Sequence, residues 1–279
     1  MTGLPAQTSR LDAELVRRGL ARSRAHAQDL VRADKVLLDG RVAGKPSLPV
    51  GPHADVRVEQ DGPVWVGRAA YKLVAALDAF GPQGLQVTGR RCLDVGASTG
   101  GFTQVLLHRG AHSVVAVDVG HDQLADAVRR DPRVRSVEGR SVRDLSVEEI
   151  GAPAGLVVVD LSFISLRLVL GRIATLVVPD GDLVVLVKPQ FEVGRARLGK
   201  GGIVRRGRDR ADALRGVCAA ATEAGLGILA LLPSPLRGSE GNAEYLGWMT
   251  PRPDGRLGTE QIEDLVTAMC EDERIGRAR

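Results

Sequence analysis

The sequence is poor in cysteine. Among its 279 residues only Cys92, Cys218 and Cys270 are cysteines, and none belongs to a Cys-x-x-Cys or Cys/His arrangement. Zinc sites need such clusters, so no metal site is predicted. Sparse, scattered cysteine is typical of a reducing compartment, and we therefore expect a cytoplasmic protein.

Long apolar segments are also lacking. Residues 1–15 do not contain the apolar core of a signal peptide. The most apolar region, 166–187, is interrupted by Arg172, Pro179, Asp180, Gly181 and Asp182. Because a membrane-spanning helix needs about 20 consecutive apolar residues, we expect no membrane partner. Internal repeats and low-complexity segments are absent as well, which favours an ordinary globular protein.

Positive charge is in excess and unevenly distributed. The formal net charge is +4 and the isoelectric point about 9.2. Residues 1–59 contain ten Lys or Arg against seven Asp or Glu, and residues 188–215 contain nine against three. The second cluster follows a predicted strand, where open α/β sheets bind ligands. An anionic partner is indicated, with a solvated basic face as the alternative.

From residue 91 onward, strand and helix signals alternate. Strands are predicted at 92–95, 114–118, 134–137, 156–160, 182–188, 227–232 and 243–249. Helices are predicted at 100–109, 122–130, 166–177, 208–224 and 259–271, and a further helix at 68–80 precedes this region. Continuous apolar strands such as 156–159 belong in a parallel sheet that is covered on both faces. The last two strands lack an intervening helix, so we expect an antiparallel pair at one edge.

The stretch 93–102, Leu-Asp-Val-Gly-Ala-Ser-Thr-Gly-Gly-Phe, forms a strand, a glycine-rich turn and a helix start. Such a turn lets the backbone approach a ligand closely. Asp118 ends the next strand, where an acidic residue suits ribose hydroxyls. A nicotinamide cofactor would favour G-x-G-x-x-G, whereas this loop resembles the S-adenosylmethionine loop of class I methyltransferases. The predicted cofactor-binding residues are Asp94, Gly96, Ala97, Ser98, Thr99, Gly100, Gly101, Phe102, Asp118 and Val119.

The N-terminal residues form a separate small module in this interpretation. Helices are predicted at 10–18 and 24–33, followed by a hairpin at 36–42 with Asp39-Gly40 as its turn. The pattern resembles the S4 RNA-binding domain, which implies that its arginines hold structured RNA. A charged helical hairpin without a ligand is the alternative. Domain limits are set at 1–60 and 68–279, with 61–67 as a linker whose Trp65 is expected to pack between the domains.

Charged residues stand at the ends of several predicted strands. Asp160 ends the fourth strand, Lys188 ends the fifth, and Glu244 precedes the last. Lys72 lies on the helix at 68–80. Taken singly, these residues are consistent with an ion pair, a surface glutamate and an ordinary helix lysine. Together they resemble the Lys-Asp-Lys-Glu tetrad of FtsJ-like ribose 2′-O-methyltransferases.

The whole chain from 10 to 270 resembles the TlyA (haemolysin A-like) rRNA methyltransferases. The motifs that carry this resemblance are DVGASTGGFT, VVDLSFIS, LVKPQFE and GNAEY. It implies a class I Rossmann-like fold, with a seven-stranded, mostly parallel sheet and helices on both faces, preceded by a small α+β S4-like domain. It also implies methylation of cytidine ribose hydroxyls in 16S and 23S rRNA of ribosomal subunits. A membrane-active cytolysin and a small-molecule methyltransferase are the alternatives, and no protein partner is predicted.

The residue chemistry suggests a mechanism that needs no metal, since a sulfonium methyl donor is already activated. Lys188 is the candidate that deprotonates the 2′-hydroxyl or makes it more acidic, and burial near Lys72 would favour a neutral amine. Asp160 would align Lys188 and the hydroxyl, and Glu244 would orient Lys72 or the ribose. The basic stretch 195–210 is expected to be a mobile loop that clamps RNA. The predicted RNA-binding residues are Arg10, Arg17, Arg18, Arg22, Arg24, Lys35, Arg68, Arg195, Arg197, Lys200, Arg205 and Arg206.

Overall fold

The computed structural model describes residues 8–21, 23–59 and 63–271. The chain divides into two compact units, with the boundary between Val64 and Trp65. Arg22, one of the predicted RNA-binding residues, lies outside the described residues.

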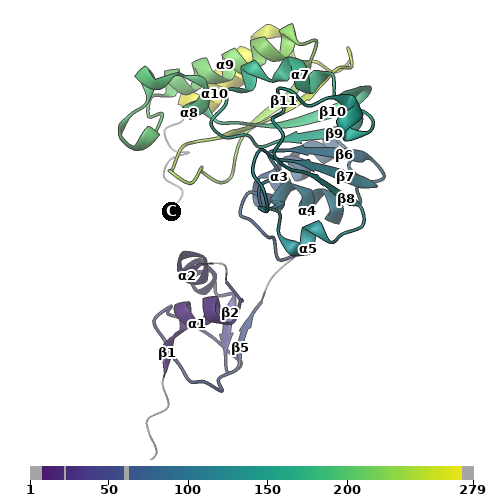
Figure 1. Ribbon diagram of the computed structural model, residues 1–279. Coiled ribbons are helices and arrows are strands. Elements are labelled where there is room, and N and C mark those ends of the chain that lie inside the picture. Colours follow the sequence, from purple (N-terminus) through teal and green to yellow (C-terminus); the bar gives the residue numbers. More distant parts are fainter. Residues whose placement is uncertain (1–7, 22, 60–62, 272–279) are drawn as a thin grey trace, which may run out of the picture. The chain divides into compact units, whose positions relative to one another are not determined.

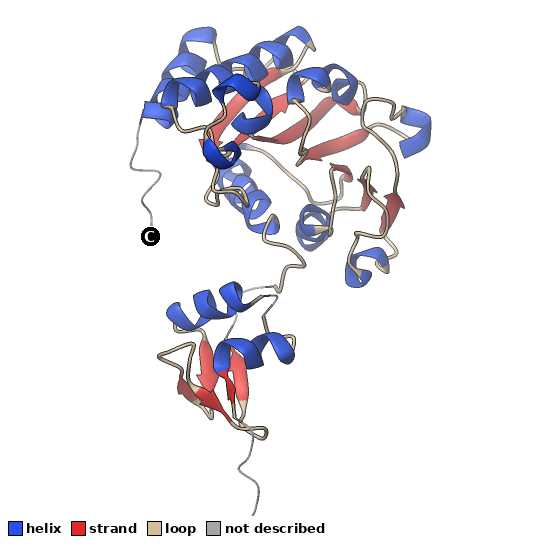
Figure 2. Ribbon diagram, turned by 60° about the vertical axis from the view of Figure 1, so that its left-hand side comes forward, coloured by secondary structure: helices blue, strands red, loops and turns tan. Residues whose placement is uncertain are grey.

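The first unit joins two helices to small sheets (Figure 2). Its elements are β1 (Ser9–Arg10), α1 (Leu11–Arg17), α2 (Arg24–Arg32), β2 (Val36–Leu38), β3 (Arg41–Val42), β4 (Pro49–Val50) and β5 (Val56–Val58). The Ser23 hydroxyl caps α2 by accepting the His26 N–H at 3.2 Å. Asp39 and Gly40 both have positive φ, as an Asp-Gly hairpin turn requires. The predicted helices and hairpin are therefore present.

The second unit contains a sheet of seven strands among its described residues, in the order β11-β12-β10-β9-β6-β7-β8 (Figure 1). Strand β12 is antiparallel to both neighbours, and the other described pairings in this sheet are parallel. The class I fold predicted from the sequence is confirmed. The strands are β6 (Arg91–Val95), β7 (Ser113–Val117), β8 (Val134–Val137), β9 (Ala154–Val159), β10 (Val177–Val187), β11 (Gly227–Pro233) and β12 (Tyr245–Thr250).

Helices cover both faces of this sheet (Figure 1). Successive side chains of a strand point to opposite faces. Thus Leu93 and Val95 pack with α7, α9 and α10, whereas Cys92 packs with α3 and α4 on the other face. The helices are α3 (Ala70–Phe80), α4 (Gly101–His108), α5 (Asp126–Arg129), α6 (Val147–Ile150), α7 (Leu170–Ala174), α8 (Pro189–Glu192), α9 (Gly207–Glu223) and α10 (Thr259–Glu271). Short 3-10 turns are η1 (Gly81–Gln83), η2 (Leu166–Leu168), η3 (Arg195–Arg197) and η4 (Lys200–Gly202).

Three details differ from the sequence prediction. The helix predicted at 166–177 is divided into η2 and α7, and β10 begins at Val177. The short helix α6 was not predicted, although Ser146 and Glu149 form a capping box at its start. Trp65 packs inside the second unit, where its ring lies edge-on to His108 at 5.5 Å.

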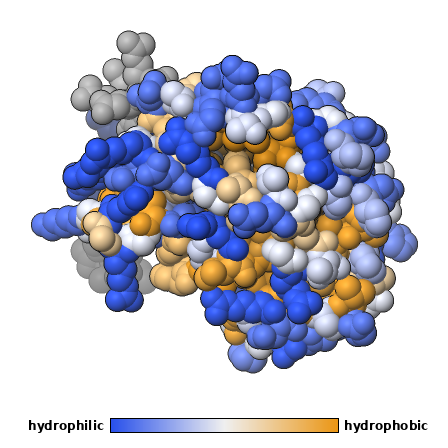
Figure 3. Space-filling view, turned by 90° about the horizontal axis from the view of Figure 1, so that it is seen from above, coloured by the Kyte–Doolittle hydropathy of each residue, from blue (hydrophilic) through white to orange (hydrophobic). Residues whose placement is uncertain are grey.

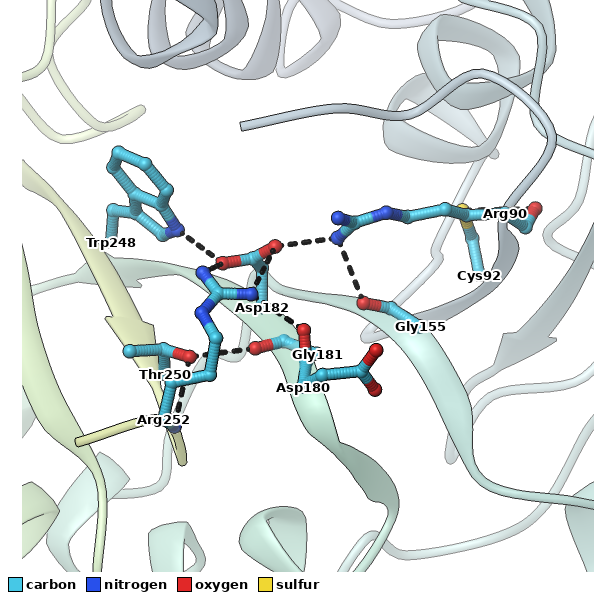
Figure 4. A network of polar contacts seen from close by, with 9 residues as sticks. All are labelled: Arg90, Cys92, Gly155, Asp180, Gly181, Asp182, Trp248, Thr250 and Arg252. Atoms are coloured by element: carbon cyan, nitrogen blue, oxygen red, sulfur yellow. Dashed lines mark hydrogen bonds and ion pairs between the residues drawn. The ribbon is translucent and has the colours of Figure 1, made fainter. Parts of the chain in front are cut away.

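Asp182, a buried carboxylate within β10, connects this strand to neighbouring segments of the sheet (Figure 4). Asp182 is fully buried and accepts hydrogen bonds from Arg90, Arg252 and the Trp248 indole. Arg90 also donates to the Gly155 carbonyl at 3.1 Å. Removing Asp182 would leave the Trp248 indole N–H without its acceptor in the interior. This network fixes β10 and β12 at the end opposite Lys188 and Glu244.

The outer surface of the helical layer above the sheet is mainly hydrophilic at its rim, with apolar residues visible between the polar ones (Figure 3).

Three cysteines are buried and unpaired: Cys92, Cys218 and Cys270. Within the part of the chain that the structure describes, no helix is long and apolar enough to cross a membrane.

Candidate active site

The loop between β6 and α4 approaches its neighbours so closely that two positions require glycine. Gly96 has a φ of +88°, and a Cβ there would overlap the Asp160 carbonyl oxygen. Gly100 has a φ of +91°, and a Cβ would lie 2.7 Å from Leu124. Both the backbone conformation and the lack of space exclude larger residues. The loop therefore lies directly against the end of β9.

Asp94 is a fully buried carboxylate beneath this loop. Its Oδ2 accepts the Thr103 hydroxyl at 2.6 Å, whereas Oδ1 has no hydrogen-bond partner among the described residues. Burial raises the pKa of Asp94 to about 7, and the Thr103 hydrogen bond opposes that rise. A buried oxygen without a partner is unfavourable unless a ligand supplies a donor.

Asp118 follows β7 at the same edge of the sheet. Its carboxylate accepts the Ser98 N–H at 2.8 Å and the Gly120 N–H at 2.7 Å. It lines a hollow of about 410 Å³ together with Val119, Gln123, Arg140 and apolar residues. A cavity of this size with a few polar groups suits a small organic ligand.

A second hollow of about 240 Å³ lies beside the first. Gly96, Ser98, Asp160 and Ser162 line both hollows. The second hollow is also lined by four other predicted cofactor residues: Ala97, Thr99, Gly101 and Phe102. The glycine loop therefore forms a shared wall between the two spaces, and Lys188 lines the smaller one.

The four charged tetrad residues form two ion pairs. Lys188 Nζ lies 2.7 Å from Asp160 Oδ1, and Lys72 Nζ donates to Glu244 Oε2. Lys188 also donates to the Ser162 hydroxyl at 2.9 Å. All four side chains are largely buried. Buried ion pairs need such well-matched partners, because an unpaired charge in the interior is strongly unfavourable.

Chain topology explains how these residues come together. Strands β9 and β10 are parallel neighbours with Val159 opposite Val185, so the residues that follow them emerge at one edge. Glu244 precedes β12, which runs antiparallel to β10, and it therefore reaches the same edge. Glu244 also needs space, since a Cβ at Gly238 would lie 2.6 Å from its Oε1.

Residues 65–250 match the FtsJ-like methyltransferase family, and residues 9–56 match the S4 domain. The chain is 49% identical over 262 residues to the 16S/23S rRNA (cytidine-2′-O)-methyltransferase TlyA of Mycobacterium tuberculosis, which covers 94% of this chain and 97% of that protein. This chain belongs to the TlyA family of FtsJ-like methyltransferases. The family identified from the sequence motifs is confirmed.

Two further TlyA-like proteins have names of a different kind. The Hemolysin A of Brachyspira hyodysenteriae is 36% identical and covers 85% of this chain and 98% of its own length. A solved structure from Streptococcus thermophilus, described as a hemolysin, is 35% identical with a TM-score of 0.69. It covers 95% of this chain and 96% of its own.

In the first unit of this TlyA-family chain, buried carboxylates hold the predicted RNA-binding arginines. Asp12 accepts hydrogen bonds from Arg10 and Arg24. Glu14 accepts them from Arg17 and Arg18. Arg10, Arg17 and Arg24 remain more than half exposed, whereas Arg18 is 23% exposed and donates to the Ala54 carbonyl.

The remaining predicted RNA-binding residues lie in both units. Lys35 follows α2 in the first unit, and Arg68 lines the smaller hollow of the second. The others are exposed on the basic stretch after α8: Arg195, Arg197, Lys200, Arg205 and Arg206.

That basic stretch is more structured than the mobile loop expected from the sequence. It forms η3 and η4, and the buried Asn242 side chain accepts the Val204 N–H at 2.9 Å and donates to the Gly202 carbonyl at 3.0 Å. Arg197 forms an ion pair with Asp212 at 2.6 Å. Asn242 was not among the predicted site residues, although it belongs to the GNAEY motif that contains Glu244.

Sequence reasoning also missed two residues beside the tetrad. Ser162 contacts Lys188, and Glu192 contacts the loop that follows Asp160. Both are letters of motifs already singled out, DLSFIS and KPQFE. Polar residues shortly after two adjacent parallel strands were the available signal, because the side chains of such loops meet at one edge.

Proposed function

We propose that this chain transfers the methyl group of S-adenosylmethionine to the ribose 2′-hydroxyl of cytidines in 16S and 23S rRNA. The observation that carries the proposal is the Lys188–Asp160 ion pair, which lies over the glycine loop and lines the smaller hollow. The family membership and the S4 domain support an rRNA substrate. Ribosomal subunits in the cytoplasm are the proposed partners.

The two hollows fit S-adenosylmethionine. Asp94 lines neither hollow, but its Oδ1 is buried without a hydrogen-bond partner among the described residues, so it can accept the cofactor's amino group through water. Asp118 and Val119 line the larger hollow, where an acidic side chain can hold ribose hydroxyls. When bound, the cofactor supplies a methyl group on an electrophilic sulfonium.

Lys188 is positioned to hold the acceptor oxygen. Its ammonium has three N–H donors, of which one is directed to the Ser162 hydroxyl, and the Asp160 carboxylate neutralises its charge from 2.7 Å. A further N–H is available to the 2′-oxygen, whose developing negative charge it would stabilise. During methyl transfer the Asp160 carboxylate would take up the proton of the 2′-hydroxyl. This arrangement favours Lys188 as a charged donor over Lys188 as the base.

The second pair acts as support in this mechanism. Lys72 and Glu244 are both buried and neutralise each other. Together they fix the edge of the sheet next to Lys188, and Glu244 holds the Lys72 ammonium in place. Alignment of the reacting atoms is the main contribution that such fixed side chains make to the rate.

The proposal is tested by supplying the purified chain with ribosomal subunits and S-adenosylmethionine that carries a labelled methyl group. The expected product is 2′-O-methylcytidine, identified by nuclease digestion and mass spectrometry of the separated 16S and 23S rRNA. A methyl group on a base atom, or transfer to a small molecule but to neither rRNA, would contradict the proposal.

A further inference from the structure

Glu192 links two loops of the site without belonging to the tetrad. One oxygen of its carboxylate accepts the Ser165 hydroxyl at 2.5 Å, and the other accepts the Leu166 N–H at 2.8 Å. The Ser165 hydroxyl in turn accepts the Arg167 N–H at 3.2 Å. The start of η2 is thus capped by a residue that comes from the loop after a different strand.

The loop that Glu192 caps is strained. Phe163 has a φ of +64° and is 92% exposed, so its own side-chain packing does little to hold this conformation. A left-handed conformation at a residue with a Cβ costs about 1–2 kcal/mol and persists only where the flanking structure imposes it. One flank is fixed by the Asp160 N–H, which donates to the Val95 carbonyl at 3.0 Å. The other flank is fixed by the contacts of Glu192.

The turn that carries Glu192 also carries Lys188. Lys188 immediately precedes α8, and its carbonyl accepts the Phe191 N–H at 2.9 Å. The Phe191 ring lies 5.2 Å from that of Phe163 in the facing loop. A fixed separation between Glu192 and Ser165 therefore fixes the separation of the two loops on which the Lys188 contacts depend.

We propose that Glu192 is a positioning residue, which holds the 160–165 loop against the Lys188 turn so that Asp160 and Ser162 stay in contact with the Lys188 ammonium. The inference rests on the proposed methyl transfer. Glu192 is not among the residues that line either hollow, so it acts through the loop and not on the substrate.

The electrostatic setting of Glu192 agrees with this role. Burial raises its pKa, and the hydrogen bonds from Ser165 and Leu166 oppose the rise. A charged carboxylate is tolerated at this buried position because it accepts hydrogen bonds from both the Ser165 hydroxyl and the Leu166 N–H. The neutral isostere Gln offers an amide oxygen for the Leu166 N–H and an amide N–H for the Ser165 oxygen, so it can preserve the link without the charge.

The test compares Glu192→Ala with Glu192→Gln in the rRNA methylation assay. Glu192→Ala is expected to lower kcat by about 10- to 100-fold, since a displacement near 1 Å has effects of that size. Its KM for ribosomal subunits and its Kd for S-adenosylhomocysteine are expected to stay within about twofold, because the hollows are untouched. Glu192→Gln is expected to restore kcat to within about threefold of the unchanged chain.

Backbone hydrogen exchange gives a readout that does not depend on activity. In Glu192→Ala, exchange in the segment 160–168 is expected to accelerate, because the Leu166 N–H loses its acceptor. Ser165→Ala is expected to lower kcat less than Glu192→Ala does, since the Leu166 contact remains. Ser146→Ala is the matched control: it removes the serine cap of α6, another short helix of the same unit, and is expected to leave kcat unchanged.

Three outcomes would overturn the inference. The first is an unchanged kcat in Glu192→Ala, and the second is unchanged exchange in 160–168. The third is a Glu192→Gln variant as inactive as Glu192→Ala, which would assign the carboxylate a direct chemical role. If the unchanged chain itself transfers no methyl group to rRNA, the proposed function fails instead, and hydrogen exchange still reports on the link.

Discussion

Two buried carboxylates of the first unit, Asp12 and Glu14, have the opposite property to Asp94 of the second. Asp12 and Glu14 in the first unit and Asp94 in the second are almost completely inaccessible to solvent. Hydrogen bonds from Arg10 and Arg17 hold the pKa values of Asp12 and Glu14, respectively, well below their usual range. Burial instead raises the pKa of Asp94 to about 7. The difference is the presence or absence of a cation from the chain itself.

The comparison suggests what each site is built to bind. In the first unit the carboxylates fix the arginines from below and leave their outer N–H donors to solvent, an arrangement suited to phosphate groups. In the second unit Asp94 has no cation beside it among the described residues, so it is suited to a positively charged group of a bound ligand. The Lys72–Glu244 pair is a third arrangement, in which both partners are buried.

The largest expected effect comes from removing Lys188, the cation proposed to contact the acceptor oxygen. Lys188→Ala is expected to lower the rate of methyl transfer to rRNA by at least about 100-fold, because alignment and charge stabilisation are lost together. Binding of S-adenosylhomocysteine serves as the control and is expected to persist. A variant that keeps more than a tenth of the activity would remove Lys188 from the mechanism.

Next in size is the effect of leaving a buried lysine without its partner. Glu244→Gln is expected to lower the free energy of unfolding of the second unit by about 3–5 kcal/mol, as for other broken buried pairs. Urea denaturation measures this. The matched control is Glu263→Gln, whose pair with Arg215 is 40–46% exposed, and about 1 kcal/mol or less is expected there. Equal losses in the two variants would contradict the distinction between buried and exposed pairs.

Because Asp94 has no cationic partner among the described residues and a raised pKa, we expect cofactor binding to depend on pH. With a pKa of about 7, the ionised fraction of Asp94 rises about tenfold between pH 6 and pH 8. A cationic amino group prefers the ionised form, so the Kd for S-adenosylmethionine, measured by calorimetry, is expected to fall about tenfold over this range. Asp94→Asn is expected to bind weakly with no such dependence. Equal affinities at both pH values would show that Asp94 does not receive the cation.

The same shift affects the free protein in the opposite direction. The folded state holds the Asp94 proton more tightly than the unfolded state, in which the pKa is near its usual 3.8. Stability of the ligand-free chain is therefore expected to fall as the pH rises from about 4 to about 7. Thermal denaturation with Asp94→Asn as the reference isolates this contribution.

The smallest expected effect lies in the first unit. Asp12→Asn leaves Arg10 and Arg24 in place but loosens them, so affinity for rRNA is expected to fall by roughly three- to tenfold, as for one or two weakened phosphate contacts. The control is Asp29→Asn, whose pair with Arg32 is exposed on both sides and is expected to have no effect. Filter binding at fixed salt measures both. Equal affinities for the two variants would mean that Asp12 does not position the arginines for RNA.

The sequence was most informative where function depends on neighbours along the chain. The glycine loop at 96–101 and the residues that end β9 and β10 were predictable, because strand, turn and cap signals are local. The burial of Asp12 was not predictable, since its partner Arg24 is twelve positions away on another helix. The same holds for Glu192, whose partner Ser165 belongs to the loop after a different strand.

Boundary errors have local physical causes. The predicted helix at 166–177 contains Val177, which joins β10 instead, because pairing with Ala154 of β9 extends the sheet there. Helix α6 has four residues, Val147–Ile150, which is too short for a periodicity argument. Its capping box, Ser146 with Glu149, was the available signal.

The position of Trp65 has a practical consequence for studying the two units. The sequence contains two tryptophans, and both Trp65 and Trp248 are buried in the second unit. Intrinsic tryptophan fluorescence therefore reports the unfolding of the methyltransferase unit alone, because the S4 unit contributes no tryptophan signal. A difference between the fluorescence and circular dichroism transitions would measure how independently the two units unfold, with no label and no truncation.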